Sequence, residues 1–190
     1  MTLKTFLQLI SGLLLALSYP ICSVSQTRDH LTPQEVDLVK DAQELDKRID
    51  VFVKAADRRL LALNGTVDAA NAKQLKKDAE LWGELPTGSR SELVGDIARI
   101  LDEAITNIDD VSGRDENNPL VPRALRKLAT EATRIVDQLK PLSSQAKGDE
   151  EIASFEQLME NAHSILEAAN KLPPPVDKKK EKAKNNKTGN

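Results

Sequence analysis

Apolar residues recur in steps of three and four along most of this chain, and that spacing constrains the fold more than any other feature. Steps of three and four place residues on one face of an α-helix. No alternating apolar pattern of useful length occurs. Aromatic residues make up only 3% of the chain and there are 8 glycines, which disfavours β-sandwiches and barrels. We therefore expect an all-α fold.

The longest pattern predicts one continuous helix from Thr32 to Leu63. Thr32 and Glu35 form a capping box, in which each side chain bonds a free amide of the first turn, and Pro33 suits the first helical position. The stripe that follows is Leu38, Ala42, Leu45, Ile49, Phe52, Ala56, Leu60 and Leu63. Asn64-Gly65 ends it. Such a helix is about 48 Å long.

Four further helices follow, each bounded by cap or breaker residues. The sequence predicts a short helix over 68–82, one from the capping box Ser89–Glu92 to Gly113, one over about 122–142, and one from the cap Asp149 to Pro173. Pro141 should kink the third of these or end its regular part. Short loops favour antiparallel neighbours. The predicted fold is an up-and-down antiparallel bundle of four long helices plus one short helix.

The first 25 residues have the pattern of a secretory signal peptide. Lys4 precedes a short apolar run, and the small residues Ser23 and Ser25 suit the positions before a cleavage point. We expect cleavage after Ser25, which removes the chain's one cysteine and leaves Gln26 first. An uncleaved anchor and a lipoprotein attached at Cys22 are the alternatives. The predicted location is exported, either periplasmic or secreted.

Charge divides the rest of the chain into two segments. The predicted bundle domain, 26–172, has 20 Lys and Arg against 28 Asp and Glu, while the segment 173–190 has 6 Lys against 2 acidic residues. This last segment begins with three prolines and is nearly free of apolar residues, so we expect it to be disordered. Its lysines are a candidate contact for an envelope protein or an anionic surface.

Candidate ligand residues are few. Glu160 and His163 have the Glu-x-x-His spacing of di-iron bundles, but such sites need two copies and two further glutamates. Helical phase places His163 on the polar face, so we expect it to be exposed. A haem would need axial ligands from Met159 and the two histidines, and His30 is expected in a mobile lead-in.

Asp109-Asp110 stand at a helix end and favour solvated charge. Arg58-Arg59 and the lysines Lys73, Lys76 and Lys77 give short basic faces, whose acidic neighbours at helical spacing predict pairing within a helix. Asn64-Gly65-Thr66 and Asn186-Lys187-Thr188 match the glycosylation sequon. The acidic domain disfavours nucleic-acid binding.

The sequence leads to a functional expectation without assigned site residues. No catalytic, cofactor-binding or metal-ligating residue is assigned, because no nucleophile has a positioned base. We expect an exported, non-enzymatic helical bundle that binds an unidentified partner, with no transmembrane span in the mature chain. The alternatives are a metal- or haem-carrying bundle and a self-associating structural protein.

Overall fold

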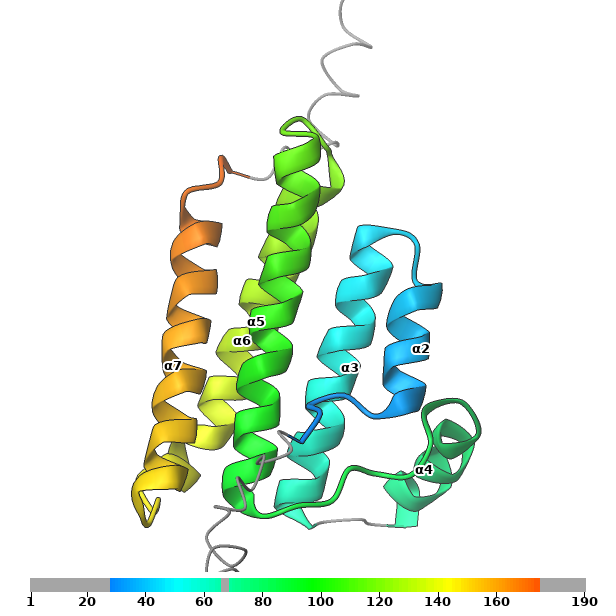
Figure 1. The fold of residues 1–190 in the computed structure, drawn as a ribbon, viewed down its shortest axis with the longest axis vertical. Helices are drawn as coiled ribbons and strands as arrows, with labels where there is room; N and C mark the ends of the chain where they lie inside the picture. Colours follow the sequence, from blue (N-terminus) through cyan, green and yellow to red (C-terminus); the bar gives the residue numbers. More distant parts are fainter. Residues whose placement is uncertain (1–27, 66–68, 175–190) are drawn as a thin grey trace, which may run out of the picture.

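The computed structural model describes residues 28–65 and 69–174, and within them it contains six α-helices and no strand (Figure 1). The all-α prediction is confirmed. No helix in these ranges is long and apolar enough to cross a membrane. The predicted signal peptide and residues 175–190 of the predicted tail lie outside the described residues. The helices are α2 (Pro33–Asp41), α3 (Leu45–Asn64), α4 (Ala69–Trp82), α5 (Arg90–Arg114), α6 (Leu120–Ser143) and α7 (Asp149–Asn170).

The prediction of one continuous helix from Thr32 to Leu63 is wrong. The chain leaves the helix at residues 42–44, which we call the hinge, and α2 folds back beside α3 as a helical hairpin (Figure 1). Ala42 has ψ 86° and Glu44 has ψ 137°, both far from helical values. The hairpin brings Glu35 against α3, where it is fully buried, and this long-range contact competes with the local helical pattern.

Several local signals act as predicted and others do not. Both capping boxes are present, with Thr32 and Ser89 as the N-cap residues. Gly113 does not end α5, which continues to Arg114. Gly148, with φ 82°, occupies the N-cap position of α7 that was predicted for Asp149. α6 continues past Pro141 to Ser143.

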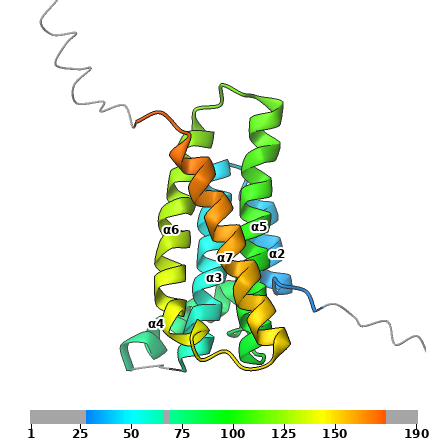
Figure 2. The same cartoon turned by 90° about the vertical axis from the view of Figure 1, so that its left-hand side faces the viewer.

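Four helices, α3, α5, α6 and α7, pack around one apolar core. In Figure 2, α7 lies in front of α3 and between α5 and α6. The largest apolar side chains with less than 2% exposure are Phe52, Ile49, Ile97, Ile100, Leu101, Ile108, Leu128, Ile135, Leu139, Leu158 and Ile165. Helices α2 and α4 lie at the periphery (Figure 1).

Two neighbouring helix pairs are parallel, which the predicted antiparallel bundle did not include. Ser91 of α5 contacts Ser154 of α7 at 3.2 Å, and about two turns further along both helices Asn161 donates to the carbonyl of Ala98 at 2.8 Å. Because the contacts advance in the same sequence direction along both helices, α5 and α7 are parallel. Helices α3 and α6 are parallel in the same way. The consecutive long helices α3, α5, α6 and α7 alternate in direction (Figure 1).

Candidate functional site

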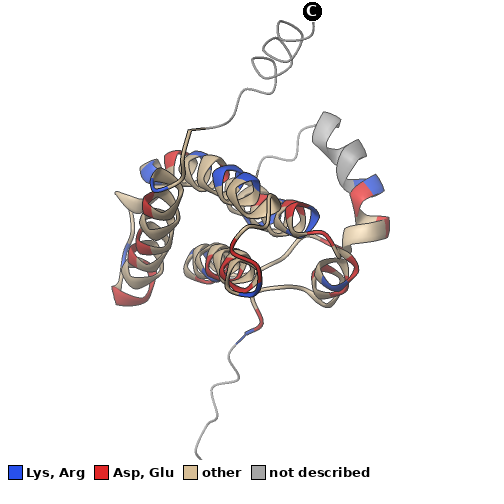
Figure 3. Cartoon of the chain, turned by 90° about the horizontal axis from the view of Figure 1, so that it is seen from above, with Lys and Arg blue, Asp and Glu red and all other residues tan. Residues whose placement is uncertain are grey.

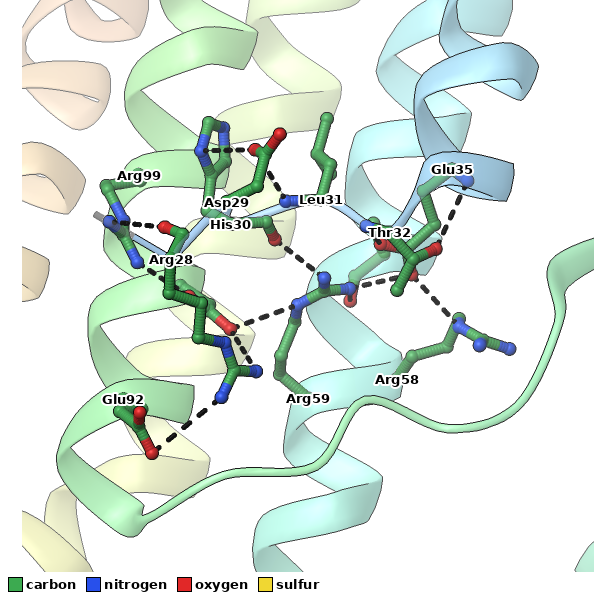
Figure 4. A network of polar contacts seen from close by, with 12 residues as sticks. Arg28, Asp29, His30, Leu31, Thr32, Glu35, Arg58, Arg59, Glu92 and Arg99 are labelled. Carbon is green, nitrogen blue, oxygen red and sulfur yellow. Dashed lines mark hydrogen bonds and ion pairs between the residues drawn. The ribbon is translucent and has the colours of Figure 1, made fainter. Parts of the chain in front are cut away.

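Residues 28–31, which we call the N-terminal segment, cross from α5 to the start of α2 (Figure 4). Leu31 packs in the apolar core. The guanidinium group of Arg99 donates to the carbonyl of Arg28 at 3.3 Å, and that of Arg59 donates to the carbonyl of His30 at 2.6 Å. Arginines from α5 and α3 therefore fix the backbone of this segment.

Glu35 is the only buried residue of α2, and its side chain is 0% exposed. Its Oε1 accepts from Arg58 Nε at 3.0 Å and from Arg59 Nη1 at 2.7 Å, while its Oε2 accepts from the backbone N–H of Thr32 at 2.9 Å (Figure 4). One carboxylate therefore completes the capping box of α2 and attaches α2 to α3. A buried carboxylate needs such partners, because an unpaired one is strongly destabilising.

Arg58 extends the same contacts to the end of α4. Its Nη2 donates to the carbonyls of Gly83 at 3.2 Å and Glu84 at 2.5 Å, and its guanidinium carbon lies 5.8 Å from the ring centre of Trp82. That distance suits a cation–π contact. Arg58 thus joins α2, α3 and the segment that follows α4.

Asp96 of α5 is the second fully buried carboxylate. It accepts from Arg28 Nη2 at 3.0 Å and from Arg99 Nη2 at 2.7 Å, and Arg59 Nε lies 3.9 Å away. Burial raises the pKa of Asp96 above its ordinary value, and the positive charges of Arg28, Arg99 and Arg59 act against that rise. We call the whole set the Glu35–Asp96 cluster: Arg28, Glu35, Arg58, Arg59, Asp96 and Arg99.

The sequence predicted that His30 lies in a mobile lead-in, and this prediction is wrong. Its Nε2 lies 2.7 Å from Glu103 Oε2 on α5, and its Nδ1 lies 3.7 Å from Asp29 Oδ1. The side chain is 23% exposed. The ring therefore adds a polar contact between the N-terminal segment and α5.

An open hollow of about 500 Å³ lies between the N-terminal segment and the loop before α5. Arg28 and Arg59 line it, but both already bond the carboxylates of the Glu35–Asp96 cluster. Four arginines meet two carboxylates in this cluster and Glu92 adds a third, 3.7 Å from Arg28, so one positive charge is left in excess. The arrangement holds elements together, and the two guanidinium groups that line the hollow are already bonded to carboxylates.

A second depression, which we call the end recess, lies where α6 ends and α7 begins. It measures about 390 Å³ and is mainly apolar. Ile152 is 43% exposed there, one of two large apolar side chains in the described residues that are so exposed. The lining residues are Ser143, Ala146, Ile152, Phe155, Glu156 and Met159.

The candidate ligands named from the sequence do not come together. The side chain of His163 is 74% exposed and lies 3.5 Å from Glu167. Met159 lines the end recess, whereas His30 contacts α5. Among the described residues, no three His, Cys, Asp or Glu side chains are grouped to hold a metal ion.

The prediction that Arg58-Arg59 form a basic face paired within their own helix is wrong, since both are buried and bond Glu35 of α2. Asp109-Asp110, Lys76, Lys77 and Asn64 are exposed, as expected of surface residues. The side chain of Lys73, Thr66 and the second sequon lie outside the described residues.

Sequence reasoning missed Glu35 and Asp96 as buried charges. Asp96 did carry a signal, because it stands among core residues in Leu93-Val94-Gly95-Asp96-Ile97-Ala98. The sequence around Glu35 gave no sign of a buried charge, because the capping box already accounted for a glutamate at that position. Comparison with known protein families, curated proteins and solved structures finds no match to this chain.

Proposed function

We propose that this chain is an exported helical bundle that acts by binding another molecule and not by catalysis. The end recess carries this proposal. Its lining combines Phe155, the flexible thioether of Met159 and the exposed Ile152. Apolar surface that a soluble protein leaves exposed is a typical contact for a partner, and methionine adapts readily to different apolar shapes. A partner's apolar side chain fits this lining.

The position of Arg28 supports export with removal of the leader. The predicted cleavage point after Ser25 lies three residues before Arg28, whose side chain is bonded to Asp96. Cleavage there leaves every contact of the N-terminal segment in place. The proposed mature protein is thus a four-helix bundle with two peripheral helices, placed in the periplasm or outside the cell.

The basic tail supports a second contact. Its six lysines follow a run of three prolines, while the bundle domain has an excess of acidic residues. A segment whose charge is opposite to that of the bundle suits contact with an anionic surface, and such contact weakens as salt rises. We propose that the tail brings the bundle near an envelope surface, where the end recess binds a protein.

The binding proposal is tested with the full chain immobilised and probed with an envelope fraction from the cells that make it. We expect wild type to retain a partner and Ile152→Glu to lose it, because a charge in the recess opposes an apolar side chain. Ala153→Glu is the matched control, since Ala153 is exposed and does not line the recess. No retention by wild type, or equal retention by all three chains, would overturn the proposal.

The export proposal is tested by cell fractionation and N-terminal sequencing of the released chain. Gln26 is the expected first residue. Replacing Ser23 and Ser25 together by bulky residues should leave the leader attached. A chain that stays in the cytoplasm with Met1 intact would contradict export.

A further inference from the structure

The hinge between α2 and α3 has the composition of a helix. Ala42, Gln43 and Glu44 include neither glycine nor proline, and all three favour helical conformation. The apolar stripe also runs through them without a change of phase, from Leu38 through Ala42 to Leu45. Locally, the sequence from Thr32 to Leu63 favours a straight helix, although the chain turns back at the hinge.

The hairpin leaves the start of α3 without a side-chain cap. Glu44 is the N-cap residue, and its side chain makes no capping hydrogen bond. The first amides of a helix lack partners within the helix. A straight hinge would supply them, because the carbonyl groups at the end of α2 would stand one turn before the first amides of α3.

The contacts that hold α2 in place do not depend on which copy supplies the helix. Among helices, α2 contacts only α3 and α4, and its buried contact is the Glu35 carboxylate between Arg58 and Arg59. The N-terminal segment adds Arg28 on Asp96 and His30 on Glu103. A second copy of residues 28–41 presents the same groups in the same order.

We propose that two copies of this chain exchange α2 and the N-terminal segment to form a domain-swapped dimer. The hinge straightens in each copy, and each Glu35 enters between Arg58 and Arg59 of the other copy. The contacts of residues 28–41 with α3, α4 and α5 seen in the hairpin are kept across the two copies. At the hinge, helical hydrogen bonds replace the bonds that Gln43 donates to the carbonyl of Lys40 and Arg48 donates to the carbonyl of Ala42. This inference does not depend on the proposed binding function.

Such an exchange requires a second copy. A straight hinge in a single chain would withdraw Glu35 from the buried guanidinium groups of Arg58 and Arg59, and it would pull Leu31 out of the apolar core. Both changes are strongly unfavourable. The hairpin is therefore the favoured form at low concentration, and the dimer becomes favoured as concentration rises. Exchange is slow, because the contacts of α2 must break before they re-form.

Glu44→Pro separates the two forms. Glu44 is exposed and has φ −84° in the hairpin, close to the value that proline imposes. In a straight helix a proline at position 44 removes a backbone hydrogen bond and clashes with the carbonyl of Lys40. Glu44→Ala is the matched control, because alanine favours a straight helix. The readout is the molar mass of the full chain by light scattering after size-exclusion chromatography.

We expect wild type and Glu44→Ala to form more dimer as concentration rises, and the dimer to persist for hours after dilution. Glu44→Pro should lower the dimer association constant by more than about a hundredfold, with unchanged helical content by circular dichroism. A wild-type chain that stays monomeric, also after partial unfolding and refolding at high concentration, would overturn the proposal. A dimer that Glu44→Pro forms equally well, or that dissociates at once on dilution, would overturn it too.

Discussion

Helix α3 has charge pairs on two of its faces, and the two sets differ in exposure, although the side chain of Asp46 in the second set is only 9% exposed. Towards α2 and α5, Arg58 and Arg59 belong to the Glu35–Asp96 cluster, and the Arg59 side chain is 1% exposed. Towards α6, three acidic residues pair with three basic ones, and Asp57 and Arg134 are 40% and 37% exposed. We call the second set the α3–α6 ladder: Asp46–Arg123, Asp50–Lys127 and Asp57–Arg134.

The ladder is regular and the cluster is not. All three ladder pairs join residues 77 positions apart in the sequence, so the two parallel helices keep one register along their length. Figure 3 marks Lys and Arg in blue and Asp and Glu in red, and both colours recur along the helices. The cluster instead joins the N-terminal segment, α2, α3, the loop after α4 and α5 at one point.

The two regions differ in whether water and salt can compensate a charge that has lost its partner. Water and salt compensate an exposed charge that loses its partner, and such pairs contribute about 0.2–1 kcal/mol. No solvent reaches Glu35 or Arg59, so removal of one partner leaves a buried charge and costs about 3–5 kcal/mol. We infer that the cluster determines how stable the attached elements are, whereas the ladder determines register.

Glu35→Gln should give the largest loss of stability. Glutamine keeps the shape and can still serve in a capping box, so the change isolates the negative charge between Arg58 and Arg59. We expect the free energy of unfolding to fall by about 3 kcal/mol, measured by urea denaturation. Glu44→Gln, at an exposed position, is the control. A loss below about 1 kcal/mol would show that the cluster contributes no more stability than an exposed charge pair, which would contradict the contrast.

Gly88→Ala should give an intermediate loss. An alanine Cβ there would stand 2.2 Å from Arg28 Nη1 and 3.1 Å from Glu92 Oε2, so the guanidinium group must shift, which weakens its contacts with Glu92 and Asp96. Charge-assisted hydrogen bonds of this kind contribute about 1.5–3 kcal/mol, and Arg28 is partly exposed. We therefore expect unfolding free energy to fall by about 1–2 kcal/mol.

Two comparisons show whether Arg28 is the cause of that loss. Gly113→Ala meets no atom within 4 Å and should be neutral or stabilising. Arg28→Met combined with Gly88→Ala should cost no more than Arg28→Met alone, as measured by thermal unfolding. Additive losses would show that alanine at position 88 acts through some other contact.

The local part of this fold could be predicted from the sequence, and the non-local part could not. The capping boxes at Thr32 and Ser89 depend on residues three apart, so their pattern is visible in the chain. The apolar stripes identify the helices because burial repeats with every turn. The hinge was missed because its residues favour a helix, and the turn results from contacts of Glu35 with residues 23 and 24 positions away.

The buried charges were missed for the same reason. Arg58 and Arg59 have acidic neighbours at helical spacing, which suggested pairing within α3. Their true partners come from α2, the N-terminal segment and the loop after α4. No local rule distinguishes an arginine that points to solvent from one that meets a carboxylate on another helix. Only the packing of α2 and α5 on α3 decides it.

The ladder should give a small, salt-sensitive effect. A double-mutant cycle of Asp57→Ala and Arg134→Ala should yield a coupling energy of about 0.2–1 kcal/mol at low salt. At about 1 M salt, where charges are screened within about 3 Å, the coupling should approach zero. The loss caused by Glu35→Gln should not change over that range. A coupling that survives high salt would remove the contrast between the two regions.

The last effect concerns Glu151, near the start of α7, which is 8% exposed and pairs with Arg90 of α5. The side-chain hydrogen bond from Arg90 and the backbone N–H of Lys147 lower the pKa of Glu151 below its ordinary value of 4.5. Such a pair contributes stability above pH 4.5 and loses it as pH falls through the lowered pKa. Wild type should therefore unfold at a higher temperature than Glu151→Gln at pH 7, and the difference should shrink below pH 4.5. Glu150→Gln, at an exposed neighbour, should show no such dependence. A difference that grows in acid would mean that the contact stabilises the protonated carboxyl group, contrary to the direction of its pKa.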